Sequence, residues 1–130
     1  MDTTRERRAL APRDALAWTG AVLIAYVGLV HEAVGARLYP DGPALFGGPV
    51  PWHAAGVAGI AAGLALVAHL LGVVRVPQRA LAVVCGTAGV GALVLDAVVH
   101  HGFHFFAATM VVAALLVGLT AAPAAPEGHP

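Results

Sequence analysis

Four long apolar segments dominate this chain and leave it few possible folds. They cover roughly residues 15–34, 53–74, 80–100 and 103–120. A helix needs about 20 apolar residues to cross the hydrocarbon core of a bilayer. Only 11% of the 130 residues are charged, whereas soluble domains carry about 25%. The sequence therefore predicts an all-α membrane protein, a bundle of four transmembrane helices that crosses the cell membrane several times.

The arginines predict how this bundle is oriented, because cytoplasmic segments of membrane proteins are enriched in positive charge. Only Arg37 lies between the first two segments, and no basic residue lies between the last two. We therefore expect residues 36–52 to form an extracytoplasmic loop rich in proline, glycine and aromatic residues, and both termini to be cytoplasmic. The other basic residues precede the first segment or join the second to the third: Arg5, Arg7, Arg8, Arg13, Arg75 and Arg79.

The whole chain is interpreted as a single integral membrane domain. Residues 1–14 form an arginine-rich cytoplasmic N-terminus, residues 15–120 the four-helix bundle, and residues 121–130 a disordered tail rich in alanine and proline. A cleaved signal peptide is the alternative interpretation of the first segment. The apolar core of a signal peptide has about 7–15 residues. The first segment is longer than this, so we expect it to be retained as the first helix.

Composition excludes several classes of function. Seven arginines balance seven acidic residues, so the chain lacks the basic field that attracts nucleic acid, and the lipid bilayer is the expected partner. Cys85 is the only cysteine, which excludes intramolecular disulfides and thiolate metal clusters. The chain contains no serine, which excludes a serine nucleophile. Nothing in the sequence identifies a reaction or a substrate.

Histidines and acids gather near the predicted extracytoplasmic ends of the segments. Ionisable groups inside a membrane are costly and usually serve a function. The predicted topology places all of these residues in the outer third of the bundle, where side chains from helices about 10 Å apart can meet. We call this set the outer-end cluster, and it consists of His31, Glu32, His53, Asp96, His100, His101 and His104.

The outer-end cluster predicts a transition-metal site, because imidazole and carboxylate ligands suit Zn, Fe, Mn or Cu(II). The expected ligands are His31, His53, His100 and His104, and Asp96 and Glu32 would orient them or carry protons. Gly102 separates His101 from His104, so one of these two histidines can fall outside the site. Haem b is a second cofactor hypothesis; against it, the outer end is lined by small residues, and Arg37 is the only arginine near enough to bind a propionate.

Other hypotheses remain open for the same residues. The histidines can be structural, hydrogen-bonded to carbonyl groups or facing lipid headgroups, in a non-catalytic accessory or scaffold subunit of a larger membrane complex or in a homo-oligomer. They can also relay protons. His69 lies about 24 Å of helix rise from His53 and is interpreted as a packing or interfacial residue.

Small residues predict close helix packing. Gly59 and Gly63 form a GxxxG pair in the second segment, and small residues on one helix face let two backbones approach closely in lipid. The loop of residues 36–52 has four prolines yet keeps several aromatic and aliphatic side chains. It is expected to fold into a compact cap above His31 and His53, with Tyr39 and Trp52 at the level of the lipid headgroups.

Overall fold

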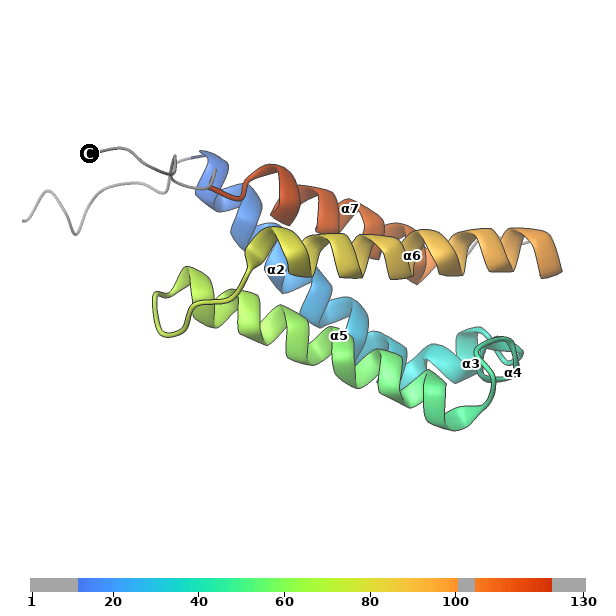
Figure 1. The fold of residues 1–130 in the computed structure, drawn as a ribbon. Helices are drawn as coiled ribbons and strands as arrows, with labels where there is room; N and C mark the ends of the chain where they lie inside the picture. The colour runs from blue at the N-terminus through green and yellow to red at the C-terminus, as the bar shows by residue number, and fades with distance from the viewer. Residues whose placement is uncertain (1–11, 101–104, 123–130) are drawn as a thin grey trace, which may run out of the picture.

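The computed structural model describes residues 12–100 and 105–122, and within these residues the secondary structure is helical, without strands. Pro12–Val30 packs antiparallel to Pro49–Leu70, and Gln78–His100 packs antiparallel to Phe105–Leu119 (Figure 1). In chain order the elements are α2 (Pro12–Val30), the π-helical turn η1 (His31–Gly35), α3 (Ala36–Leu38), α4 (Gly42–Leu45), α5 (Pro49–Leu70), α6 (Gln78–His100) and α7 (Phe105–Leu119).

Helix α2 holds the arrangement together, because it packs against both α5 and α7. Helix α6 packs along α7, whereas α5 and α6 hardly touch. Figure 1 shows α5 and α6 separating toward the end that carries α3 and α4. At the opposite end lie the beginning of α2, the link from α5 to α6, and the end of α7.

Three helical stretches are long and apolar enough to cross a membrane: Asp14–Leu38, Pro49–Leu70 and Gln78–Val99. Helix α7 is equally apolar but has only 15 residues, which corresponds to about 22 Å of helix. The prediction of an all-helical fold is confirmed for the described residues, and three helices of membrane-spanning length support a membrane protein. Each apolar segment identified in the sequence carries one of these helices or the shorter α7.

Two predicted helix boundaries are wrong. The first helical stretch does not end at residue 34, because η1 and α3 continue it to Leu38. Helix α5 begins at Pro49 and ends at Leu70 rather than covering residues 53–74. Proline suits the first turn of a helix, where its missing N–H group has no intrahelical partner to lose.

Glycine ends α5 in a specific way. Gly72 has a φ of 79°, a conformation that favours glycine. The N–H of Gly72 donates to the carbonyl of His69 at 3.0 Å, and the N–H of Val73 donates to that of Ala68 at 2.9 Å. This pair of bonds is the Schellman motif, which satisfies the last carbonyl groups of a helix.

His69, interpreted from the sequence as a packing or interfacial residue, contacts the link that follows α5. The N–H of Val76 donates to His69 Nδ1 at 3.2 Å. His69 therefore holds the link between α5 and α6 in place, at the end of the bundle opposite the cap. A second polar contact at that end joins α6 to α7, where Gln78 Nε2 donates to the carbonyl of Val117 at 3.0 Å.

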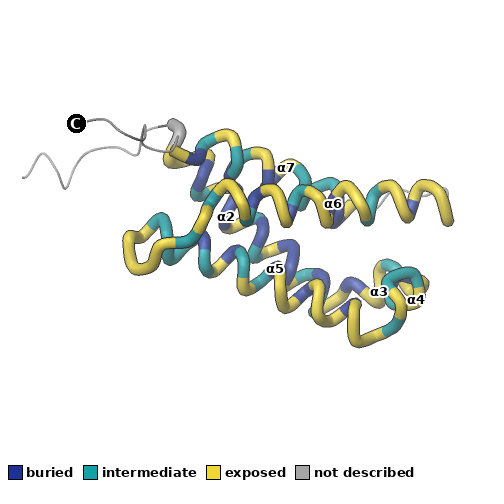
Figure 2. The backbone as a smooth tube through the Cα atoms, in the orientation of Figure 1, coloured by how far each residue is buried: buried dark blue, intermediate teal, exposed yellow. Residues whose placement is uncertain are grey.

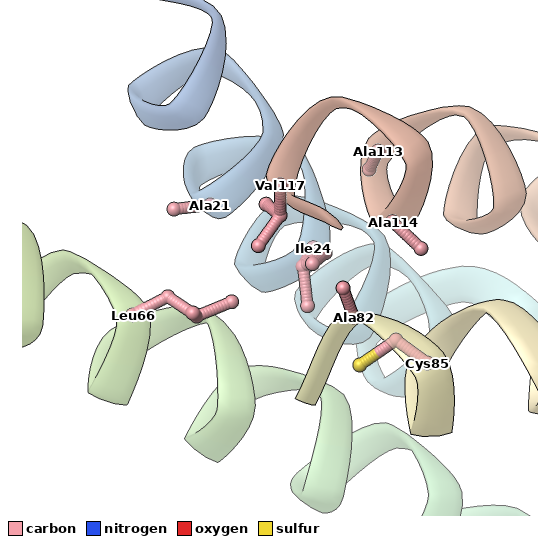
Figure 3. Close-up of a cluster of buried hydrophobic side chains, with 8 residues drawn as sticks. All are labelled: Ala21, Ile24, Leu66, Ala82, Cys85, Ala113, Ala114 and Val117. Atoms are coloured by element: carbon pink, nitrogen blue, oxygen red, sulfur yellow. The ribbon is translucent and has the colours of Figure 1, made fainter. Parts of the chain in front are cut away.

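The core consists mostly of small side chains on the facing sides of the helices. Figure 2 shows buried residues along these inner sides and exposed residues along the outer sides, as expected for helices whose outer surface faces lipid. Figure 3 shows the central cluster, in which Leu66 of α5 and Ile24 of α2 lie near the α6–α7 pair. Its members are Ala21, Ile24, Leu66, Ala82, Cys85, Ala113, Ala114 and Val117.

Glycine lets α2 and α5 approach each other closely. A Cβ atom built on Gly28 would lie 2.8 Å from the carbonyl oxygen of Gly56 and 2.9 Å from the carbonyl carbon of Gly59. A Cβ atom on Gly63 would overlap the backbone of Ala25. The small-residue packing suggested by the sequence is therefore present between these two helices, where no side chain larger than hydrogen fits.

This contact predicts a large difference between two glycine-to-alanine substitutions. Gly63→Ala should lower the free energy of unfolding by about 1–3 kcal/mol, the usual cost of overpacking, because α5 must move away from Ala25. Reversible unfolding in mixed detergent micelles, followed by circular dichroism, measures this change.

The matched control is Gly91→Ala in α6, because a Cβ atom there meets nothing within 4 Å. Its stability should equal or exceed that of the wild type. Equal losses in the two variants would contradict the proposed close contact between α2 and α5.

Candidate functional site

A π-helical turn carries the first two residues of the candidate site, His31 and Glu32. It covers His31–Gly35 and interrupts an otherwise continuous helix between α2 and α3. A π-turn adds a residue to the helical turn and changes which side chains face the neighbouring helix, and such turns are frequent at functional sites. Here His31 is buried, with 7% of its surface exposed, and the next residue, Glu32, reaches His53 on α5.

His31 is held by three contacts to the cap and to α5. Its Nε2 atom lies 2.8 Å from the carbonyl oxygen of Trp52. Because a carbonyl oxygen only accepts hydrogen bonds, Nε2 carries the hydrogen and donates it. The His31 ring stacks on Trp52, with 3.9 Å between ring centroids, and lies 6.1 Å from the ring of Phe46. In the neutral imidazole, Nδ1 is then the nitrogen with a free electron pair.

Trp52 anchors the loop of residues 36–52 over His31. It is only 1% exposed, and its indole ring takes the space that Cβ atoms would need at Gly35 and Gly42. We expected Trp52 at the level of the lipid headgroups, and this stays a prediction; the structure shows that its indole turns into the end of the bundle. The loop is compact, as expected, and its Tyr39 hydroxyl accepts a hydrogen bond from the Phe105 N–H at 3.0 Å.

Glu32 and His53 form the second polar pair across α2 and α5. Glu32 Oε2 lies 2.9 Å from His53 Nδ1. The Glu32 side chain is 23% exposed and that of His53 is 60% exposed. An ionised carboxylate accepts the hydrogen of Nδ1, which leaves Nε2 of His53 facing away from the pair. Glu32 Oε1 is buried and has no hydrogen-bond partner among the described residues.

Gly56 makes room for this carboxylate. A Cβ atom at position 56 would overlap the Glu32 side chain, which therefore lies directly against the α5 backbone. A buried oxygen atom without a partner is costly, so Glu32 Oε1 marks a position that favours a proton, a water molecule or a cation.

A small cavity adjoins His31 between the two helix pairs. Its volume is about 100 Å³, and its lining includes Phe46, Gly56, Gly89 and Met110 besides His31. Pockets for small organic molecules usually measure about 300–1,000 Å³. The cavity is therefore smaller than such a pocket, and His31 is the only histidine among the described residues of its otherwise largely apolar lining.

The structure brings only part of the outer-end cluster together. His31, Glu32 and His53 lie at one end of the α2–α5 pair. Asp96 is buried in α6, with 9% of its surface exposed, one helical turn beyond Ala92, which lines the same cavity as His31. His100 ends α6, and nothing is described of its side chain; His101 and His104 lie outside the described residues.

Metal coordination is not shown by the described part of the chain. Within residues 12–100 and 105–122, no three histidine, cysteine or acidic side chains form a group that could hold a metal ion. Sequence reasoning also missed the role of Trp52, whose carbonyl and ring both contact His31. Its position directly before His53 was visible in the sequence, but only the folded cap shows that it points inward.

Comparison with protein-family models, curated proteins and solved structures gives no match.

Because Trp52 is buried and stacks on His31, we expect truncation of its side chain to destabilise the protein strongly. Trp52→Ala should lower the free energy of unfolding by about 3–5 kcal/mol, because a large buried ring is removed and a cavity remains. Thermal unfolding in detergent measures this loss. Trp18→Ala in α2 is the matched control, because Trp18 is only partly buried, and its loss should be clearly smaller. Equal losses would contradict the buried position of Trp52.

Proposed function

We propose that this protein is a four-helix membrane protein that binds a transition metal or redox cofactor at the extracytoplasmic end of its bundle. Both termini would be cytoplasmic, because Arg75 and Arg79 lie at the same end as the beginning of α2 and cytoplasmic segments favour arginine. His31, Glu32 and His53 would supply part of the site. Because these three side chains do not form a metal-holding group by themselves, the remaining ligands would come from the end of α6 and the connection that follows it.

One observation carries this proposal: His31 and His53 each donate a hydrogen bond from one ring nitrogen to an oxygen acceptor. His31 donates to a backbone carbonyl and His53 to a carboxylate. Metal-binding histidines almost always donate their second nitrogen in this way, which fixes the ring and makes the other nitrogen a better ligand. Nδ1 of His31 and Nε2 of His53 are the nitrogens left for a metal.

Glu32 has two roles in this proposal. Its Oε2 atom orients His53, and its buried Oε1 atom supplies negative charge. Asp96, His100, His101 and His104 are proposed as further ligands or orienting groups, supplied from α6 and the connection that follows it. The candidate metals are Zn, Fe, Mn and Cu(II), which imidazole and carboxylate donors suit. Such an ion acts as a Lewis acid or carries an electron.

Histidine substitutions should remove the metal. Elemental analysis and a UV–visible spectrum of protein purified in detergent without chelators should show near-stoichiometric metal. His31→Ala and His53→Ala should each lose most of it. Glu32→Gln should weaken binding by about 10–100-fold, as is usual when the partner of a metal-binding histidine is changed.

The control for this experiment is His69→Asn at the opposite end of the bundle. Its amide oxygen can replace Nδ1 as the acceptor for Val76, and the metal content should not change. A colourless, metal-free wild type, or equal metal loss in all four variants, would overturn the proposal.

A second candidate function is that of a non-catalytic accessory or scaffold subunit of a larger membrane complex. The observation that favours it is the separation of α5 from α6 toward the capped end (Figure 1). Leu95 and Val99 are exposed and lie on the same face of α6 as Ala92, which lines the cavity between the helix pairs, and a helix of another subunit would cover them. Stable co-purification of a larger complex, with no metal in the protein, would support this function over the first.

A further inference from the structure

A second concave region of the molecule lies away from the histidines. It is a groove of about 660 Å³ between α6 and α7. Ala82 and Ala114 in its lining are buried, whereas Val83 and Leu115 are exposed. The groove thus has a floor of small side chains and flanks of larger ones. Its lining is apolar except for Thr87 and Arg79.

The length of the groove matches one leaflet of a bilayer. Along α6 it extends from Arg79 to Val90, about 16 Å at a rise of about 1.5 Å per residue. The hydrocarbon core of a membrane is about 30 Å thick, so the groove runs from the membrane surface to about the middle of the bilayer. An extended acyl chain of one leaflet covers the same depth.

Arg79 places a positive charge at the surface end of the groove. It lies in the first turn of α6, which contains no acidic residue. It is exposed and forms no ion pair with any other described residue. A cation at the start of a helix is unfavourable because the helix dipole is positive there. A guanidinium group binds phosphate well, since its donors match two phosphate oxygens.

We propose that the groove between α6 and α7 binds one anionic phospholipid, with its phosphate on Arg79 and an acyl chain along the apolar lining. Basic residues beside transmembrane helices recognise anionic headgroups in this way. The apolar depth of the groove selects a lipid rather than free phosphate. A second copy of the chain fits less well. A two-fold axis along the membrane normal would bring two Arg79 side chains to the same depth, where like charges repel.

The role of the Arg79 charge in lipid binding is tested by titrating detergent-solubilised protein with phosphatidylglycerol or phosphatidylcholine. Native mass spectrometry measures the lipid adducts. The wild type should bind one phosphatidylglycerol in preference to phosphatidylcholine. Arg79→Gln should weaken phosphatidylglycerol binding about fivefold. This factor corresponds to the attraction of about 1 kcal/mol between one basic residue and an anionic headgroup. Arg75→Gln is the matched control, because Arg75 lies four residues before Arg79, in the link from α5 to α6, and does not line the groove. The binding of phosphatidylglycerol to this variant should not change.

The groove itself is tested by a pair of neighbouring substitutions. Val83 lines the groove and is 61% exposed, whereas Val84 is 64% exposed and does not line it. Val83→Trp should abolish the phosphatidylglycerol adduct by filling the groove, although Arg79 is retained, and Val84→Trp should not.

Three outcomes would overturn this proposal. The first is equal affinity of the wild type for both lipids, and the second is equal loss in the two arginine variants, which would indicate a diffuse charge effect. The third is a dimer that forms without lipid and is broken by Val83→Trp but not by Val84→Trp, which would assign the groove to a second copy of the chain.

Discussion

The close approach of α2 and α5 is the contact on which the rest of the candidate site depends. Gly28, Gly59 and Gly63 remove the side chains that would keep the two backbones apart. In lipid, helices gain little from burying apolar surface against each other, so close packing and interhelical hydrogen bonds hold them together. The two polar pairs of the site, from His31 to Trp52 and from Glu32 to His53, bridge these same two helices.

The polar pairs follow from this packing and from the π-turn. His31 and Glu32 are the first two residues of this turn; the His31 ring is buried under the cap, and the Glu32 carboxylate lies against Gly56. A buried polar group costs free energy unless it is hydrogen-bonded, and Trp52 satisfies one nitrogen of His31 through its carbonyl while covering the ring. The remaining buried atom, Glu32 Oε1, has no partner among the described residues, and this is consistent with the proposed cation site as well as with a bound proton or water molecule.

The two helix pairs differ in how tightly they pack. The α2–α5 pair carries the close glycine contacts and the polar bridges, whereas the α6–α7 pair leaves a groove open along its length. Helix α2 joins the pairs through its contact with α7, where Gly20 lies against Ala113 and Val117. The cap, His31 and His53 thus belong to the tightly packed α2–α5 pair, whereas the open apolar groove belongs to the α6–α7 pair. The proposed metal site and the proposed lipid site are therefore independent of each other.

The sequence by itself determined the class of this protein. Runs of about 20 apolar residues have few stable arrangements other than membrane helices, because every backbone polar group must be satisfied within lipid. Each of these runs carries a helix in the structure, although two of the predicted boundaries are wrong. The sequence also located the region of the site, since His31, Glu32 and His53 lie near the ends of two adjacent apolar segments.

Only the tertiary structure decided how these residues are used. The π-turn at His31–Gly35 and the Schellman motif at Gly72 depend on local backbone geometry, which apolar runs do not encode, and so both helix ends were misplaced. The inward position of Trp52 depends on the space left by Gly35 and Gly42, two residues far from it along the chain. Hydropathy is a property of segments, whereas the pairing of His31 with a carbonyl and of His53 with Glu32 is fixed by the distance between α2 and α5.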